Sequence, residues 1–155
     1  MPPAGAKSYD LPPGHSEKSW ESHPAVSGRI LALGAHMHKY ATELRFEDVT
    51  ASKILWDTKP IVDKTGEPVG MPVKTFWWSL GIPLHPNHLY RVTAIYENPT
   101  GQTIPLGGMG TLGGVFMPSN VESWPKVDRS APDYVLDLKD TMSTEDMGDM
   151  AGMAH

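Results

Sequence analysis

The frequent prolines and glycines are the feature that most restricts what this chain can fold into. There are 15 prolines and 15 glycines among 155 residues, a share that favours turns and strands over helices. No stretch repeats its apolar residues with the 3.6-residue period of an amphipathic helix, whereas several short runs read as strands. These strand-like runs are residues 28–34, 42–49, 53–56, 74–80, 89–96, 103–106, 115–117 and 134–138. The pattern predicts an all-β fold, a jelly-roll-type β-sandwich of about eight antiparallel strands.

Changes in composition along the chain predict three regions. Residues 1–26 are rich in Pro, Gly, Ser and charge without periodicity, and we expect an extended N-terminal arm there. Residues 27–140 hold the strand-like runs and are predicted to form the sandwich. Residues 141–155 are too polar to build a core and are expected to form a flexible, methionine-rich tail.

The overall composition argues against several classes of function. The net charge is −5 and no basic stripe is present, which argues against nucleic acid as the main partner. No run approaches the ~20 apolar residues that cross a bilayer. The absence of cysteine excludes disulfides, thiolate metal sites and cysteine nucleophiles, and no Gly-x-Ser-x-Gly motif indicates a hydrolase.

The nine methionines suggest a compartment and a metal. Thioethers are soft ligands that stay usable where thiols would be oxidised, which fits copper handling outside the cytoplasm. We therefore expect a periplasmic or extracellular location, although the Met1-Pro2-Pro3 start lacks a signal-peptide pattern.

Two histidines two positions apart form the main candidate site. His36 and His38 follow the apolar run 28–34, and residues at i and i+2 of a strand project from the same face. The pair therefore suits two ligands of one transition-metal ion, but imidazole binds zinc, copper, iron and nickel alike. The alternative is an ordinary pair of strand histidines.

Three pieces of the chain together resemble a known family. They are His36-Met37-His38, the strand Tyr90–Asn98 with its Tyr-Glu-Asn end, and the pair Gly107-Gly108. In this order they resemble the C-terminal domain of the copper type II, ascorbate-dependent monooxygenases, the peptidylglycine α-hydroxylating and dopamine β-monooxygenases. The resemblance covers roughly residues 28–118 and implies that His36 and His38 are ligands of the family's oxygen-binding copper.

The third ligand is where the chain departs from that family. The family carries its methionine a few residues beyond the glycine pair, where this chain reads Thr111-Leu112-Gly113-Gly114. Met109 is a candidate thioether ligand, and Met117 is a second. Both methionines could instead be packing residues of the core. His88 could complete the site if its turn folds toward the histidine pair.

A second departure concerns electron supply and the carboxy terminus. The family's hydroxylases carry another copper on a preceding domain, and this chain is too short to hold both domains. Its remaining histidines, at positions 15, 23, 85, 88 and 155, form no obvious second trio. Met142, Met147, Met150, Met153 and His155 resemble the methionine-rich segments of copper-resistance proteins, which hold Cu(I), and a solvated tail is the alternative.

These observations predict a mononuclear copper-binding β-sandwich that uses a His-x-His pair for copper holding, electron transfer or O2 activation. Whether the protein is an enzyme is left open by the sequence. The alternative is a non-catalytic structural or interaction module that keeps the monooxygenase-like fold within a larger assembly. In that alternative, the N-terminal arm and the C-terminal tail bind protein partners.

Overall fold

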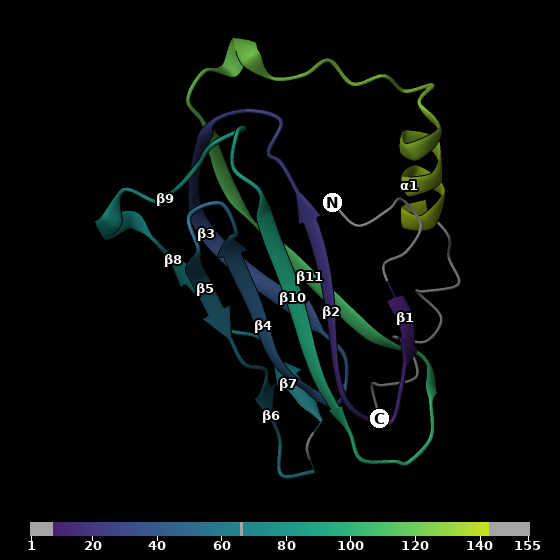
Figure 1. The fold of residues 1–155 in the computed structure, drawn as a ribbon. Helices are drawn as coiled ribbons and strands as arrows, with labels where there is room; N and C mark the ends of the chain where they lie inside the picture. Colours follow the sequence, from purple (N-terminus) through teal and green to yellow (C-terminus); the bar gives the residue numbers. More distant parts are fainter. Residues whose placement is uncertain (1–7, 66, 143–155) are drawn as a thin grey trace. The chain divides into compact units, whose positions relative to one another are not determined.

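The chain forms two layers of antiparallel strands, which a computed structural model describes for residues 8–65 and 67–142 (Figure 1). The strands are β1 (Ser8–Leu11), β2 (Gly14–Ser22), β3 (Gly28–Met37), β4 (Ala41–Asp48), β5 (Lys53–Thr58), β6 (Ile61–Val62), β7 (Pro68–Gly70), β8 (Val73–Thr75), β9 (Ile82–Leu84), β10 (Tyr90–Asn98) and β11 (Ile104–Pro118). Two 3-10 helices, η1 (Trp77–Ser79) and η2 (Val121–Ser123), and one α-helix, α1 (Pro132–Met142), complete the described elements.

The strands pair into two main sheets and one small one. A five-stranded sheet has the order β1-β11-β3-β8, with β9 also paired to β3. A four-stranded sheet has the order β2-β10-β4-β5, and β6 pairs only with β7. Figure 1 shows β2, β10 and β4 in a layer in front of β3 and β11. The prediction of an all-β, antiparallel sandwich is therefore confirmed, while its jelly-roll connectivity stays a prediction.

The core lies between the two main sheets in two clusters of buried side chains. One cluster consists of Leu11, Met37, Ala41, Leu44, Ala94 and Tyr96. The other consists of Ile30, Leu33, Phe46, Trp56, Ile82 and Tyr90. Each cluster draws on strands of both sheets, so neither sheet can bury its apolar face without the other.

The prediction of an N-terminal arm over residues 1–26 is wrong for residues 8–22. These residues form β1 and β2, and β2 pairs with the whole of β10, from Gly14 opposite Asn98 to Ser22 opposite Tyr90. Because β2 is an edge strand, most of its side chains are exposed and polar, which hid the alternation in the sequence. Residues 1–7 lie outside the described part of the chain.

The prediction of a strand over residues 134–138 is wrong, because α1 occupies this segment. Pro132 stands at the first helical position and Asp133 in the first turn, both favourable at a helix N-terminus. A run of five residues is too short for its period to separate strand from helix. The sandwich unit ends at Pro125 rather than at residue 140, and α1 belongs to a second unit.

The segment 74–80 is also shorter as a strand than predicted. The strand β8 ends at Thr75, and the chain then forms η1, whose last turn is closed by Leu80 in a left-handed conformation with a φ of 58°. Among the described residues, no helix is long and apolar enough to cross a membrane. The predicted tail, from residue 143 onward, lies outside the described residues.

Candidate metal centre

The two predicted histidines lie side by side at the end of β3. Met37 points into the core with 3% of its surface exposed, so its neighbour His36 points to the opposite face. The rings of His36 and His38 have their centroids 5.5 Å apart and stand at 88° to one another. With metal–nitrogen bonds of about 2 Å and ligand angles of roughly 90–120°, two imidazoles on one ion have ring centres about 4.5–5.6 Å apart. The spacing of this pair therefore fits a shared ion.

A sharp turn follows the pair and carries the chain from one sheet to the other. Tyr40 adopts a φ of 70°, and the Ala41 N–H donates to the His38 carbonyl at 3.2 Å. The Glu97 N–H donates to the Tyr40 carbonyl at 2.9 Å, which joins this turn to β10. The backbone at His38 is thus held from both sheets.

Met109 lies on the strand next to the pair. In the register of β11 with β3, Gly110 is opposite Met37 and Thr111 is opposite His36, so Met109 and His38 each lie one residue beyond the last pair. Gly110 faces the core, because a Cβ there would come within 2.6 Å of the Ala94 Cβ. Since side chains alternate, Met109 points to the outer face of the β3–β11 pair, the face that carries His36.

A buried hydroxyl holds the two strands together behind this face. The Tyr96 hydroxyl accepts hydrogen bonds from the backbone N–H groups of His38 and Met109, each at 3.0 Å, and donates one to the Met109 carbonyl. Burial raises the pKa of Tyr96, so its hydroxyl stays protonated and able to donate. Sequence reasoning missed this role, although Tyr96 stands in the Tyr-Glu-Asn strand end already used for the family resemblance.

The structure does not bring His88 to this site. His88 precedes β10 and bonds through Nδ1 to Asp48 Oδ2 at 2.7 Å, whereas Tyr96, near the other end of β10, contacts the His38 backbone. Six residues of strand separate Tyr90 from Tyr96, a span of about 20 Å. The prediction that His88 completes the set is therefore wrong, because its turn folds onto Asp48 instead.

Met117 lies on the same outer face as Met109 but far along β11, opposite Arg29. It is 50% exposed, so the interpretation of Met117 as a core residue is also wrong. Met117 lies eight positions after Met109, about 27 Å along the strand, so the two methionines cannot bind the same ion.

The donors near the pair define what it could bind. Over residues 8–65 and 67–142, no three side chains of the His, Cys, Asp or Glu type gather in a metal-binding arrangement. Of the third ligands predicted from the sequence, Met109 is the one that lies near this end of β3, and with it the donor set would be two nitrogens and one sulfur. Lys39, the next residue in the chain, forms an ion pair with Glu67, which offsets its charge next to the pair.

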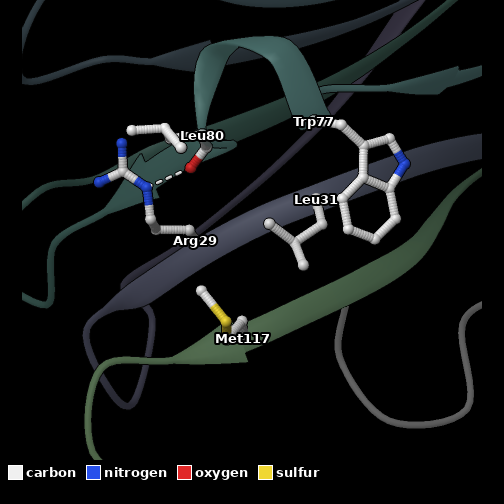
Figure 2. A pocket seen from close by; sticks show the side chains of 5 residues that line it. All are labelled: Arg29, Leu31, Trp77, Leu80 and Met117. Carbon is white, nitrogen blue, oxygen red and sulfur yellow. Dashed lines mark hydrogen bonds between the residues drawn. The ribbon is translucent and has the colours of Figure 1, made fainter.

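The other end of the outer face has a different character. A hollow of about 440 Å³ is lined by Arg29, Leu31, Trp77, Leu80 and Met117. Figure 2 shows the Trp77 ring at one side of Leu31 and Met117, and Arg29 at the other, where its Nε donates to the Leu80 carbonyl. The walls are apolar apart from the guanidinium, so this end suits an apolar group rather than a metal ion.

Comparisons of the chain with protein-family models, with curated proteins and with solved structures give no match in any of the three.

Proposed function

We propose that this protein binds a single copper ion through His36, His38 and Met109. The observation that carries the proposal is the pair of imidazoles with ring centroids 5.5 Å apart, with Met109 on the neighbouring strand one residue beyond the Gly110–Met37 pair. Two imidazoles and a thioether form a borderline-to-soft donor set that suits copper better than calcium or magnesium. The resemblance to the copper monooxygenases supports the same metal.

Copper bound by these donors would supply one-electron chemistry, since a thioether favours Cu(I) and imidazole serves both oxidation states. The protein's own contribution is to fix the donors. Tyr96 bonds the backbones of His38 and Met109 from the core side, so the two ligand-bearing strands keep their register. We include a periplasmic or extracellular location in the proposal, because a cysteine-free donor set tolerates oxidising surroundings.

The imidazole pair is tested by Cu(II) titration followed by electron paramagnetic resonance. We expect a type II signal with nitrogen coupling in a chain that carries His85→Gln, which removes the separate His85–His88 imidazole pair, and the loss of this signal when His36→Gln/His38→Gln is added, with an unchanged circular dichroism spectrum. A matched control is His23→Gln, which should keep the signal. An identical resonance spectrum with His36→Gln/His38→Gln added would overturn the proposal.

The sulfur ligand is tested by a pair of substitutions on one strand face. Met109→Leu keeps the volume of the side chain but removes the thioether, and it should weaken Cu(I) binding more than Cu(II) binding. Met117→Leu makes the same change on the same face of β11, beyond reach of the pair, and should alter neither affinity. Equal behaviour of the two variants in a competitive Cu(I) assay would exclude Met109 as a ligand.

Whether copper is only held or also used is a separate measurement. Oxygen consumption by the copper-loaded protein with ascorbate, above that of the His36→Gln/His38→Gln variant, would indicate O2 activation. A rate equal to that of the variant would indicate copper holding or electron transfer.

A second candidate function is that of an interaction module, and the exposed apolar surface around η1 favours it. Trp77 and Leu80, which line the hollow in Figure 2, are mostly exposed, and the next residue after Trp77, Trp78, is fully exposed. Exposed aromatic clusters of this kind are typical of protein contact sites. Sedimentation of the wild type over a range of concentrations, compared with Trp77→Ala/Trp78→Ala, tests for association through this surface. A monomer at all concentrations would count against self-association.

A further inference from the structure

A second pair of imidazoles lies at the opposite end of β10 from the His38 contact. His85 and His88 flank the Pro86-Asn87 turn, and their ring centroids are 5.0 Å apart at an angle of 49°. This spacing lies within the range of about 4.5–5.6 Å that two imidazoles on one ion require for metal–nitrogen bonds of about 2 Å. The pair therefore passes the same distance test as His36 and His38.

His88 is already oriented as a metal ligand would be. Its Nδ1 donates to Asp48 Oδ2 at 2.7 Å, which leaves Nε2 as the ring nitrogen for a ligand. The carboxylate is itself fixed, because Asp48 Oδ1 accepts from the Ala51 N–H at 2.9 Å. Histidine ligands in metalloproteins almost always donate their other nitrogen to such a carboxylate, which orients the ring and makes it more basic.

Aromatic packing and backbone bonds hold the turn that carries the pair. The His88 ring stacks on Tyr90 at 6.2 Å, and Tyr90 in turn stacks on Phe46 in the core at 5.8 Å. The Tyr90 hydroxyl accepts from the His85 N–H at 3.0 Å, and the His88 N–H donates to the His85 carbonyl at 3.0 Å. Both imidazoles are thus presented by a turn with little freedom to move.

A third histidine, His23, is hydrogen-bonded to the backbone of the same turn but is not part of the imidazole pair. His23 donates through Nδ1 to the His88 carbonyl at 2.8 Å. It therefore provides a matched control, a histidine of the same neighbourhood whose removal leaves both imidazoles in place.

We propose that His85 and His88 bind one divalent transition-metal ion, of the Cu(II), Ni(II) or Zn(II) class, with Asp48 as the orienting partner of His88. The site has two imidazole nitrogens and leaves the remaining positions of the ion to water. It is separate from the site proposed at His36 and His38 and does not depend on that proposal.

The test uses the full chain with His36→Gln/His38→Gln substituted, so that only the second pair can respond. Substoichiometric Cu(II) should broaden the imidazole Cε1–H nuclear magnetic resonances of His85 and His88 first. The Cu(II) titration should reach one ion per chain. Adding His85→Gln, an exposed position where the fold is not at risk, should abolish the selective broadening. Adding His23→Gln instead should leave it unchanged.

Two outcomes would overturn the proposal. One is the absence of selective broadening at His85 and His88 with the fold retained, and the other is broadening that survives His85→Gln. A positioning role of Asp48 predicts that Asp48→Asn lowers the Cu(II) affinity roughly ten- to a hundred-fold while the His85 resonance still responds. A failure of the His36–His38 site can be told apart from a failure of this site, because the first site is measured in a chain that carries only His85→Gln.

Discussion

At the scale of single residues, Tyr96 connects the core to the candidate metal centre. Its side chain is fully buried, and its hydroxyl bonds the backbones of His38, directly after β3, and of Met109 in β11, where the pairing of the two strands ends. Strand ends fray where ladder bonds stop, so a side-chain hydroxyl that caps two backbones there fixes their spacing. The geometry of the proposed ligands therefore depends on a residue that would not touch the metal.

Tyr96→Phe is expected to lower the free energy of unfolding by about 1–3 kcal/mol, because it removes the hydroxyl that bonds the part-buried backbone groups of His38 and Met109. Urea denaturation followed by fluorescence measures this change. Tyr134→Phe, in α1 of the second unit, is the control and should change the free energy by less than about 0.5 kcal/mol. Equal effects in the two variants would show that the Tyr96 hydroxyl does not hold these strands.

At the scale of secondary-structure elements, β2 is the segment whose role differs most from its sequence. It is polar along most of its length, yet it pairs with every residue of β10 and closes one edge of the four-stranded sheet. Its contribution to the core comes from Trp20, which packs against the cluster around Leu44 and Tyr96. One large aromatic side chain thus anchors a strand that otherwise depends on backbone hydrogen bonds.

Trp20→Ala is expected to cost about 2–3 kcal/mol of stability, somewhat less than a fully buried tryptophan, because Trp20 is only half-buried. Trp78→Ala removes the same side chain from a fully exposed position and should cost no more than about 0.5 kcal/mol. Thermal or chemical denaturation of both variants makes the comparison. If β2 were a peripheral arm, the two changes would have the same small effect.

A cross-strand ion pair between β2 and β10 should give His15 an unusual titration. Its ring bonds to Glu97, the residue directly opposite, at 2.5 Å, and to Glu17 at 3.4 Å. The hydrogen bond to Glu97, and secondarily that to Glu17, raises the pKa of His15 above its ordinary value of about 6.5. Because the folded pKa is raised, this pair stabilises the fold below the ordinary pKa, and its contribution is lost as the pH rises through the folded value.

Titration of the His15 imidazole by nuclear magnetic resonance checks this expectation. Glu97→Gln should return the pKa of His15 toward its ordinary value, and Glu17→Gln should lower it less. Both side chains are more than half exposed, so added salt should also lower the pKa. A pKa of His15 at its ordinary value in the wild type at low salt would contradict the ion pair.

At the scale of the whole molecule, the sandwich has its own complete core. The two core clusters and the hydrophobic residues packed against them all lie between Tyr9 and Phe116. The sandwich unit ends at Pro125, and α1 belongs to the second unit. The folding of the sandwich should therefore not require the residues after Pro125.

A chain that ends at Pro125 is expected to unfold cooperatively, with a thermal midpoint within about 2 °C of the full chain, since it keeps the core residues of both buried clusters. Circular dichroism during heating measures this.

The same truncation removes Met142, Met147, Met150, Met153 and His155, so the Cu(I) stoichiometry should fall if the methionine-rich segment holds copper. Loss of cooperative unfolding would show that the second unit supports the sandwich, and an unchanged stoichiometry would exclude the Cu(I) role of this segment.

The sequence by itself determined the fold class and the histidine pair. Alternating apolar residues and frequent Pro and Gly encode antiparallel strands locally, because side-chain direction in a strand has a period of two. The same period predicts that His36 and His38 lie close together, and their ring centroids are 5.5 Å apart, with His38 directly after the last residue of β3. These are local properties, and a local pattern suffices to predict them.

Only the tertiary structure decided which other residues belong to each pair of imidazoles. The position of Met109 near His38 depends on the register of β11 with β3, two strands more than 60 residues apart in the chain. The bond from His88 to Asp48, which keeps His88 away from the first pair, also joins residues far apart in the chain. The polar segment β2 likewise becomes a strand only because it pairs with β10. Register and pairing are fixed by which apolar faces meet in the core, and that depends on the whole chain at once.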